Sequence, residues 1–396
     1  MFPIKNRAGL LLMGLLMMFT LGVMYTWSLF RVPILEQYAW SEGQLSVTFS
    51  IVTACFALGG LTGGKLGERF SSPVCVRIAA VLCLTGYVGA SLLPADAQRA
   101  LLLFYLFYGI CTGLGIGIGY NGVIGSITAS FSGNSGTVAG ILLAAYGFSS
   151  MIVGQMIQEA LSCAIPINGI FRCMGICLFL ILMAGSFFLD TPHRTQSDSE
   201  KSIGSFTPKE MMCTPTFWML LLWNIAMSSA SLLILNCSAD VAQFFGGTAA
   251  MGMILSVSNG ICRSFIGNFF DRLGYKVVIP FISLAQVLAG ATLLPGALQH
   301  SLAWIICGLL LCGIAYGGGI TTNAAATRQL YGSQYYSTNF AIISLGVLPA
   351  SMVNALLSGL LHPNASAGYE GLFLGVFCLA AFAQGIALIL LFIRKN

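Results

Sequence analysis

The chain is built from long apolar runs that are separated by short polar breaks. Each run has about 18–25 residues, which at about 1.5 Å per residue lets a helix cross a hydrocarbon core of about 30 Å. The runs therefore predict twelve transmembrane helices, near residues 8–30, 45–64, 74–93, 100–125, 136–160, 169–189, 214–238, 248–270, 276–296, 300–323, 336–360 and 369–393.

Charged residues are too scarce for a water-facing surface. Asp, Glu, Lys and Arg make up 7% of the 396 residues, against about 25% in an ordinary soluble domain. The 47 glycines favour a helical membrane protein, because glycine lets helices approach closely. A net charge of +5 without any basic run longer than two residues argues against nucleic acid as a partner.

The most polar stretch, residues 190–213, lies midway along the chain and predicts a linker. It would separate a six-helix bundle at 1–189 from a second one at 214–396. Twelve spans put both termini and this linker on one side of the membrane, and most Lys and Arg residues fall on that side. The exceptions in the loops are Arg31, Arg99 and Arg172. The positive-inside rule then places both termini in the cytoplasm, in a multi-pass protein of the cell membrane.

A short internal repeat supports two related halves. Gly64, Glu68 and Arg69 follow the second run, and the same pattern follows the eighth at an offset of 203 residues. The second copy consists of Gly267, Asp271 and Arg272. In a tight turn the glycine permits close packing, and the acid–arginine pair can link neighbouring helix ends. The alternative is a chance similarity of two basic anchors.

The paired G-x-x-x-[DE]-R loops resemble the signature of the major facilitator superfamily. Three further stretches resemble one branch of it, the oxalate/formate antiporters and their monocarboxylate-transporter relatives. They are residues 21–33 (LGVMYTWSLFRVP), 206–218 (FTPKEMMCTPTFW) and 331–340 (YGSQYYSTNF). The resemblance implies an all-α membrane protein whose twelve transmembrane helices form two pseudo-symmetric six-helix bundles. It also implies a secondary transporter that works by alternating access.

Arg263 stands out as the one ionisable residue deep inside a span. It precedes Asp271 by eight residues, which places it about 12 Å inside the helix end. A guanidinium there costs at least about 2.5–3.5 kcal/mol, which a ligand or neighbour must offset. An unpaired cation fits an anionic substrate, and the planar fork suits a carboxylate. A polar stripe on the same helix is expected to face a water-filled path: Ser256, Asn259, Gly260, Arg263 and Gly267.

The alternative for Arg263 is that its side chain reaches the interface or binds backbone carbonyl groups. The antiporter family carries a substrate-binding arginine on this helix, and Arg263 is the matching position. By the same resemblance, Tyr25, Tyr120 and Tyr146 correspond to an aromatic cage around the anion. Without it, each tyrosine could equally pack with its hydroxyl bonded to a neighbouring helix.

Other polar residues of the spans have weaker assignments. Tyr316 and Asn323 lie seven residues apart on one helix face and could close the pocket from the second half. Trp27 is interpreted as an interfacial anchor, and Asn339 is expected to form a hydrogen bond between helices. Asp240 and Glu159 are interpreted as solvated charges at helix ends, which leaves little support for a proton relay.

The sequence departs from the oxalate exchanger at the eleventh span, which lacks the lysine of that relative. No Lys or Arg occurs between residues 329 and 393. One buried cation suits a monocarboxylate such as formate, lactate or pyruvate better than a dianion. The alternatives are a proton-coupled lactate or pyruvate symporter and an oxalate-type dicarboxylate exchanger.

No enzymatic activity is expected, because no carboxylate or histidine is predicted inside a span to do acid–base chemistry. The 13 cysteines show no metal-binding spacing, so neither a metal nor a cofactor is expected. The expected partners are a small organic anion and the lipid bilayer, with the protein as a monomer. A receptor that binds the anion without moving it is the remaining alternative.

Overall fold

The computed structural model describes residues 7–38, 40–131, 135–189, 206–332, 335–361 and 368–392. Every regular element in these ranges is helical, and 12 helical segments are long and apolar enough to cross a membrane. The all-α fold with twelve spans is therefore confirmed. The elements are α1 (Arg7–Leu21), η1 (Gly22–Thr26), α2 (Trp27–Tyr38), α3 (Glu42–Arg69), α4 (Ser72–Ala90), α5 (Ala97–Phe104), η2 (Tyr105–Thr112), α6 (Gly113–Ala129), α7 (Ser135–Ser162), α8 (Ile167–Ser186), α9 (Pro208–Met212), α10 (Pro215–Phe244), α11 (Ala249–Gly252), α12 (Ile254–Leu273), α13 (Tyr275–Leu298), α14 (Leu302–Tyr331), α15 (Tyr336–Ser344), α16 (Val347–Leu361) and α17 (Glu370–Phe392).

Four spans are longer than the hydropathy of the sequence indicates. The first, fourth, seventh and tenth have 32, 32, 30 and 30 residues. The first continues past residue 30 to Tyr38, because α1 is joined to α2 through the 3₁₀ turn η1. A kink interrupts α10, where Cys237 has non-helical dihedral angles. Such breaks change the direction of a helix and turn its side chains toward new neighbours.

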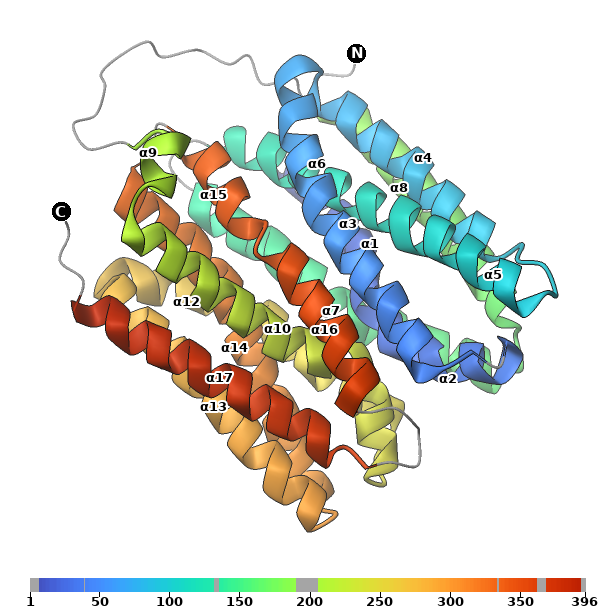
Figure 1. The fold of residues 1–396 in the computed structure, drawn as a ribbon. Helices are drawn as coiled ribbons and strands as arrows, with labels where there is room; N and C mark the ends of the chain where they lie inside the picture. The colour runs from blue at the N-terminus through green and yellow to red at the C-terminus, as the bar shows by residue number, and fades with distance from the viewer. Residues whose placement is uncertain are drawn as a thin grey trace.

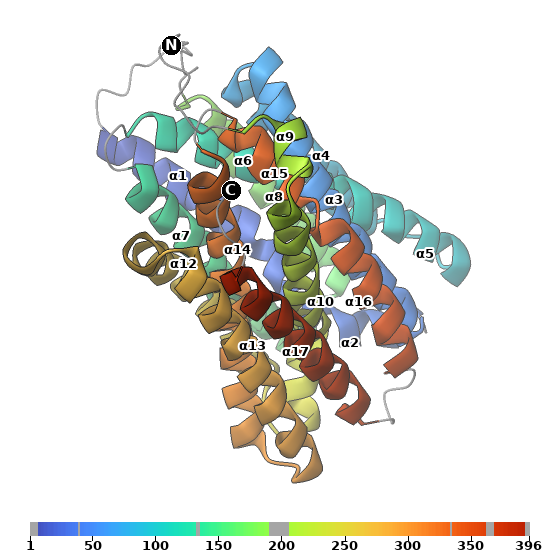
Figure 2. The ribbon, with the colours of Figure 1, turned by 60° about the vertical axis from the view of Figure 1, so that its left-hand side comes forward.

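The spans form two bundles that lie side by side. In the first, α1 packs on α7, α3 on α6 and α4 on α8. In the second, α12 and α13 pack on α14, and α17 packs on α10 and α13. Figure 1 shows the blue and cyan helices together on one side and the yellow to red helices on the other, and Figure 2 shows the same arrangement from a second direction.

The two bundles meet mainly along three helix pairs, α7 with α12, α3 with α16 and α2 with α10. In the first pair, Gly147 and Gly260 lie at the crossing, and a Cβ added to Gly260 would come within 2.8 Å of the Cα of Gly147. In the second, the Asn354 amide donates to the Ser50 hydroxyl at 2.8 Å. Small residues allow the close approach of helices in a membrane, and buried polar groups then bond across it.

The loop repeat lies where α3 and α12 end. Gly64, Gly267 and Arg272 are in the described part of the chain, and Arg272 is exposed. The side chains of Glu68, Arg69 and Asp271 lie outside the described residues. The proposed pairing of acid and arginine in these turns therefore stays a prediction.

The boundaries 1–189, 190–213 and 214–396 also stay a prediction, since residues 190–205 lie outside the described ranges. Within the proposed linker, the short helix α9 begins at Pro208. The Thr207 hydroxyl accepts from the backbone N–H of Glu210, and the Glu210 carboxylate accepts from the backbone N–H of Thr207. The bond from the Thr207 backbone N–H favours the ionised carboxylate and so lowers the pKa of Glu210.

Candidate functional site

A cavity of about 210 Å³ lies between the two bundles. It is smaller than the roughly 300–1,000 Å³ of pockets for drug-sized ligands, so it suits a small molecule. Gly64, near the last turns of α3, belongs to its lining and is exposed. The cavity therefore extends toward the end of the molecule at which α1 begins, hereafter the α1 end.

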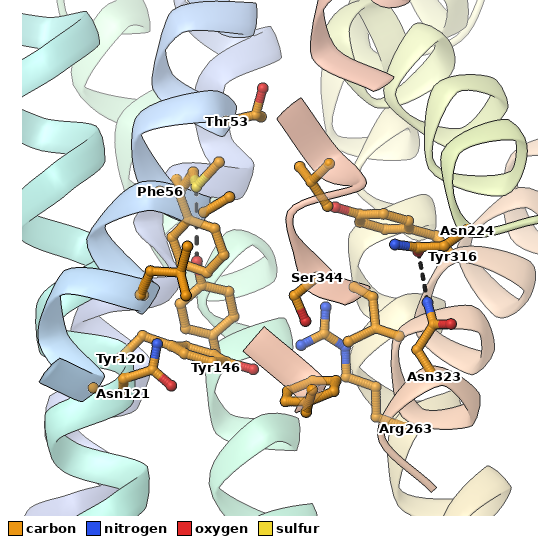
Figure 3. Close-up of a pocket in the computed structure, with 18 of the residues that line it drawn as sticks. Thr53, Phe56, Tyr120, Asn121, Tyr146, Asn224, Arg263, Tyr316, Asn323 and Ser344 are labelled. Carbon is orange, nitrogen blue, oxygen red and sulfur yellow. Dashed lines mark hydrogen bonds between the residues drawn. The ribbon is translucent and has the colours of Figure 1, made fainter. Parts of the chain in front are cut away.

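Figure 3 shows side chains from the two bundles facing each other across this cavity. The lining contains all six candidate substrate-binding residues: Tyr25, Tyr120, Tyr146, Arg263, Tyr316 and Asn323. Further lining residues include Thr53, Phe56, Asn121, Asn224 and Ser344. Among the described lining residues, Arg263 carries the only charge.

Arg263 is held in place by two neighbours. Its side chain is 4% exposed. Nε donates to the Asn259 amide oxygen at 3.1 Å, one helical turn earlier, and Nη2 donates to the Tyr25 hydroxyl at 2.8 Å, across the cavity. No carboxylate of the described residues forms an ion pair with it. A buried guanidinium with unused donors and no counter-charge has a strong preference for an anion beside it.

Aromatic rings form the wall opposite Arg263. Tyr146 is at the centre, with edge-to-face contacts to Tyr25 and Tyr120 at centroid distances of 5.3 and 5.2 Å. Phe56 lies beside Tyr120 at 5.4 Å. Rings in this arrangement stiffen one another and present an apolar surface with polar tips, as a cage for a small anion requires.

An amide pair borders the cavity on the side of the second bundle. Asn323 Nδ2 donates to Asn224 Oδ1 at 2.6 Å, and Asn224 Nδ2 donates to the Ile343 carbonyl at 3.0 Å. Sequence reasoning had selected Asn323 and missed Asn224. The signal was an asparagine within the apolar seventh run, because an amide in a span needs a polar partner.

The polar stripe on α12 differs from the prediction. Of its residues, only Arg263 lines the cavity. Asn259 orients Arg263, and Gly260 lies at the crossing with α7. The expectation that the whole stripe faces a water-filled path is wrong, since the helix turns that face toward a packed neighbour over most of its length.

A second charged group lies at the opposite end of the interface, where α2 ends and α3 begins, hereafter the α2–α3 end. Arg31 is 2% exposed and forms ion pairs with Glu42 and, at 2.6 Å, with Asp240. Arg263 is therefore not the only buried ionisable residue, and the reading of Asp240 as a solvated end charge is wrong. Hydropathy could not detect this group, because its charges come from spans about 200 residues apart.

Trp27 also differs from its expected role. It is 1% exposed, and its indole N–H donates to Asn236 Oδ1 of α10 at 3.0 Å. It is thus a contact between the bundles rather than an interfacial anchor. Asn339 does form a hydrogen bond without lining the cavity, and its partner is the carbonyl of Phe206, just before α9.

Comparison with known proteins agrees with this architecture. The family model described as "Major Facilitator Superfamily" matches residues 10–348. The chain belongs to the major facilitator superfamily. It is accordingly a membrane transporter and not an enzyme, as the sequence predicts.

Two relatives of this superfamily align with most of the chain. The "Oxalate:formate antiporter" of Oxalobacter formigenes is 25% identical over 384 residues, which cover 94% of this chain and 89% of the relative. The "Uncharacterized MFS-type transporter YhjX" of Escherichia coli is 23% identical over 335 residues and covers 83% and 81%. The predicted resemblance to the antiporter branch is confirmed as a similarity of sequence.

Solved structures share the fold. The xylose transporter XylE from E. coli, in a "partially occluded inward open conformation", superposes with a TM-score of 0.75 at 14% identity. The alignment covers 98% of this chain and all of the xylose transporter. The nucleoside transporter NupG superposes with a TM-score of 0.71 at 10% identity. At such low identity the likeness establishes the fold alone.

Proposed function

We propose that this transporter carries a small organic anion and that Arg263 binds the carboxylate of that anion. The observation that supports this is the buried guanidinium at the cavity wall without an ion-pair partner among the described residues. A carboxylate could accept two parallel hydrogen bonds from it. The hydroxyl groups of Tyr25 and Tyr316 would donate to the same anion, and Tyr120 and Tyr146 would enclose it.

A monocarboxylate such as formate, lactate or pyruvate fits better than a dicarboxylate. One guanidinium balances one carboxylate, and a second carboxylate would stay unpaired in a site of low dielectric constant. Ser344 and Val347, from the eleventh span, line the cavity as uncharged residues. The oxalate:formate antiporter among the relatives makes small carboxylates the class to test first.

Transport would proceed by rocking of the bundles about the bound anion, either in exchange for another anion or together with a coupling ion. In this conformation the cavity extends toward the α1 end, and side chains from both bundles close the α2–α3 end. With both termini in the cytoplasm, as the distribution of Lys and Arg predicts, the cavity faces inward.

Counterflow in proteoliposomes tests this function. Vesicles are preloaded with one unlabelled anion, and uptake of labelled formate, lactate, pyruvate and oxalate is compared. We expect accumulation of a monocarboxylate and little oxalate. R263Q should lower the rate by at least about tenfold, because it removes a charge-assisted bond worth about 1.5–3 kcal/mol. R172Q, which changes an exposed arginine of α8, is the matched control.

Each outcome has one meaning. Two results would refute an Arg263-dependent anion carrier. One is unchanged uptake by R263Q, and the other is a folded protein that takes up none of the four labelled anions. Rapid oxalate exchange would show that the cavity accepts a dianion. An imposed pH gradient that drives net uptake of lactate or pyruvate would identify the proton-coupled alternative.

A further inference from the structure

The charged group at the α2–α3 end contains one more negative than positive charge. Arg31 at the end of the first span faces two carboxylates, Glu42 at the start of α3 and Asp240 of α10. The arginine is 2% exposed, and the carboxylate side chains are each 13% exposed. With both acids ionised, the group holds a net charge of −1 in a region that is mostly shielded from water. Such an excess charge is costly unless it is neutralised.

Hydrogen bonds satisfy the two terminal nitrogens of Arg31, whereas Arg31 Nε and Asp240 Oδ1 are buried without a hydrogen-bond partner among the described residues. Arg31 Nη1 donates to Asn236 Oδ1 at 3.1 Å, and Nη2 contacts the Glu42 carboxylate. Asp240 Oδ2 lies 2.6 Å from Arg31 Nε, but its second oxygen, Oδ1, is buried without a hydrogen-bond partner among the described residues. One carboxylate oxygen is thus available to hold a proton.

Helix dipoles select Asp240 rather than Glu42 as the acid that is neutralised. Glu42 is in the first turn of α3, where the partial positive charge of the helix stabilises a carboxylate. Asp240 lies four residues before the end of α10, where the partial charge is negative. A proton shared by the two acids therefore resides on Asp240.

The three charges belong to different bundles. Arg31 and Glu42 come from the first bundle and form a neutral pair by themselves, whereas Asp240 comes from the second. When the bundles separate at the α2–α3 end, Asp240 is exposed to water and is stable as an anion. When they close, Asp240 is brought against a pair that is already neutral.

We propose that closure of the α2–α3 end binds one proton at Asp240, so that acid on this side of the membrane favours the closed state. The proton comes from water at that end and adds to the free carboxylate oxygen, and opening returns it there. The site regulates the conformational equilibrium and uses no substrate. It rests on the alternating-access part of the proposed function.

Other titratable groups face Asp240. Arg31 and Glu42 are described above, and Cys237 of α10 and Tyr369 before α17 interact with the same charges. His300 lies one layer further away, with its ring against Phe244 and Phe245. Cysteine and tyrosine side chains ordinarily lose their protons in the alkaline range, whereas histidine as a residue type ordinarily changes charge near neutral pH. Among the described residues near this group, His300 is therefore the one to replace as a control.

Hydrogen exchange of the purified full-length transporter in lipid nanodiscs, without substrate, tests the inference. Amide protection is followed in residues 27–38 and 236–244 from mildly acidic to mildly alkaline buffer, corrected for the intrinsic effect of pH on exchange. Uptake of one proton changes the closed-to-open ratio by up to tenfold per pH unit. We expect these segments of the wild type to be protected in acid and to open as the pH rises.

Substitutions by uncharged residues separate the contributions of Asp240, Glu42 and Arg31 to the pH response. D240N and E42Q each leave one acid with Arg31, so we expect both to stay closed at every pH. R31Q leaves two facing carboxylates and should be the most open in alkaline buffer. The matched controls E159Q, at an exposed acid of α7, and H300Q should titrate like the wild type.

Protection in the wild type that does not change with pH, or that falls in acid, would overturn the proposal. So would a pH response that D240N and E42Q both retain, or one that H300Q loses. E42Q tests the same proton site as D240N without changing Asp240. The proposal can therefore still be tested with E42Q if the D240N variant does not fold. Because no anion is used, a failure in counterflow leaves this result standing, and the reverse also holds.

Discussion

At the scale of single residues, the arrangement around Arg263 shows how a buried charge is kept without an opposite charge. Its guanidinium lies between Asn259 on its own helix and Tyr25 on the other bundle. Both partners are neutral acceptors, so they fix the direction of the side chain but leave its charge uncompensated. The charge is then available to a ligand that enters the cavity.

Removal of the Tyr25 hydroxyl should weaken anion binding. Y25F deletes the hydroxyl that is proposed to donate to the bound anion and that lies 2.8 Å from Arg263 Nη2. A bond to a charged group is worth about 1.5–3 kcal/mol, which predicts a rise of roughly tenfold or more in the half-saturating anion concentration. Concentration-dependent counterflow measures it.

Tyr335 provides the control for this experiment, because it is exposed and does not line the cavity. Y335F should transport like the wild type. An unchanged half-saturating concentration in Y25F would mean that the hydroxyl only packs between helices, the alternative that the sequence left open.

At the scale of elements, breaks in the long spans decide which residues reach the interface. The 3₁₀ turn η1 carries Tyr25, and the kink at Cys237 follows Asn236, which bonds to Trp27 and Ser46 of the first bundle. Close helix crossings complete the interface. At Gly22, an added Cβ would collide with the backbone carbonyl of Tyr146, so η1 can approach α7 only through glycine.

A methyl group at the crossing of α7 and α12 should destabilise the transporter. G260A places a carbon 2.8 Å from the backbone of Gly147, and overpacking of this kind costs about 1–3 kcal/mol. Thermal unfolding of the purified protein should therefore show a lower Tm. G385A is the matched control, because nothing lies within 4 Å of the position of its Cβ.

Alanine in a helix is intrinsically preferred over glycine by about 0.5–1 kcal/mol, so G385A should be neutral or slightly stabilising. If G260A were as stable as G385A, the contact at this crossing would not restrict the packing of the bundles.

At the scale of the whole molecule, the two ends of the interface differ. The cavity extends toward the α1 end, and Trp27, Ser28 and Arg31 contact α10 at the α2–α3 end. Interfaces of this type switch between discrete packings rather than deform continuously. Whether the cavity of this conformation opens inward or outward then depends on which end faces the cytoplasm.

Fusions to reporters test the orientation. A fluorescent protein at the C-terminus should be bright in bacterial cells and alkaline phosphatase there inactive, because both termini are predicted to be cytoplasmic. A fusion after Asp96, between the third and fourth spans, should give the opposite pattern. Active phosphatase at the C-terminus would reverse the assignment of the two ends.

Much of the candidate site could be predicted from the sequence. Arg263 was identifiable because a charge inside an apolar run is costly wherever its helix packs. Tyr25, Tyr120 and Tyr146 could be selected only through the resemblance to a family, and all three line the cavity. Asn224 and Arg31 were missed because their roles depend on partners far away in the chain.

The sequence by itself determined the number of spans, the fold class and the presence of a buried cation. These follow from local physics, since each helix satisfies its own backbone and each apolar run enters lipid by itself. Only the tertiary structure decided which face of α12 meets the cavity, that Asn259 and Tyr25 hold Arg263, and that Asp240 joins Arg31. Such pairings depend on how separate helices rotate and cross, and hydropathy along the chain contains no information about that.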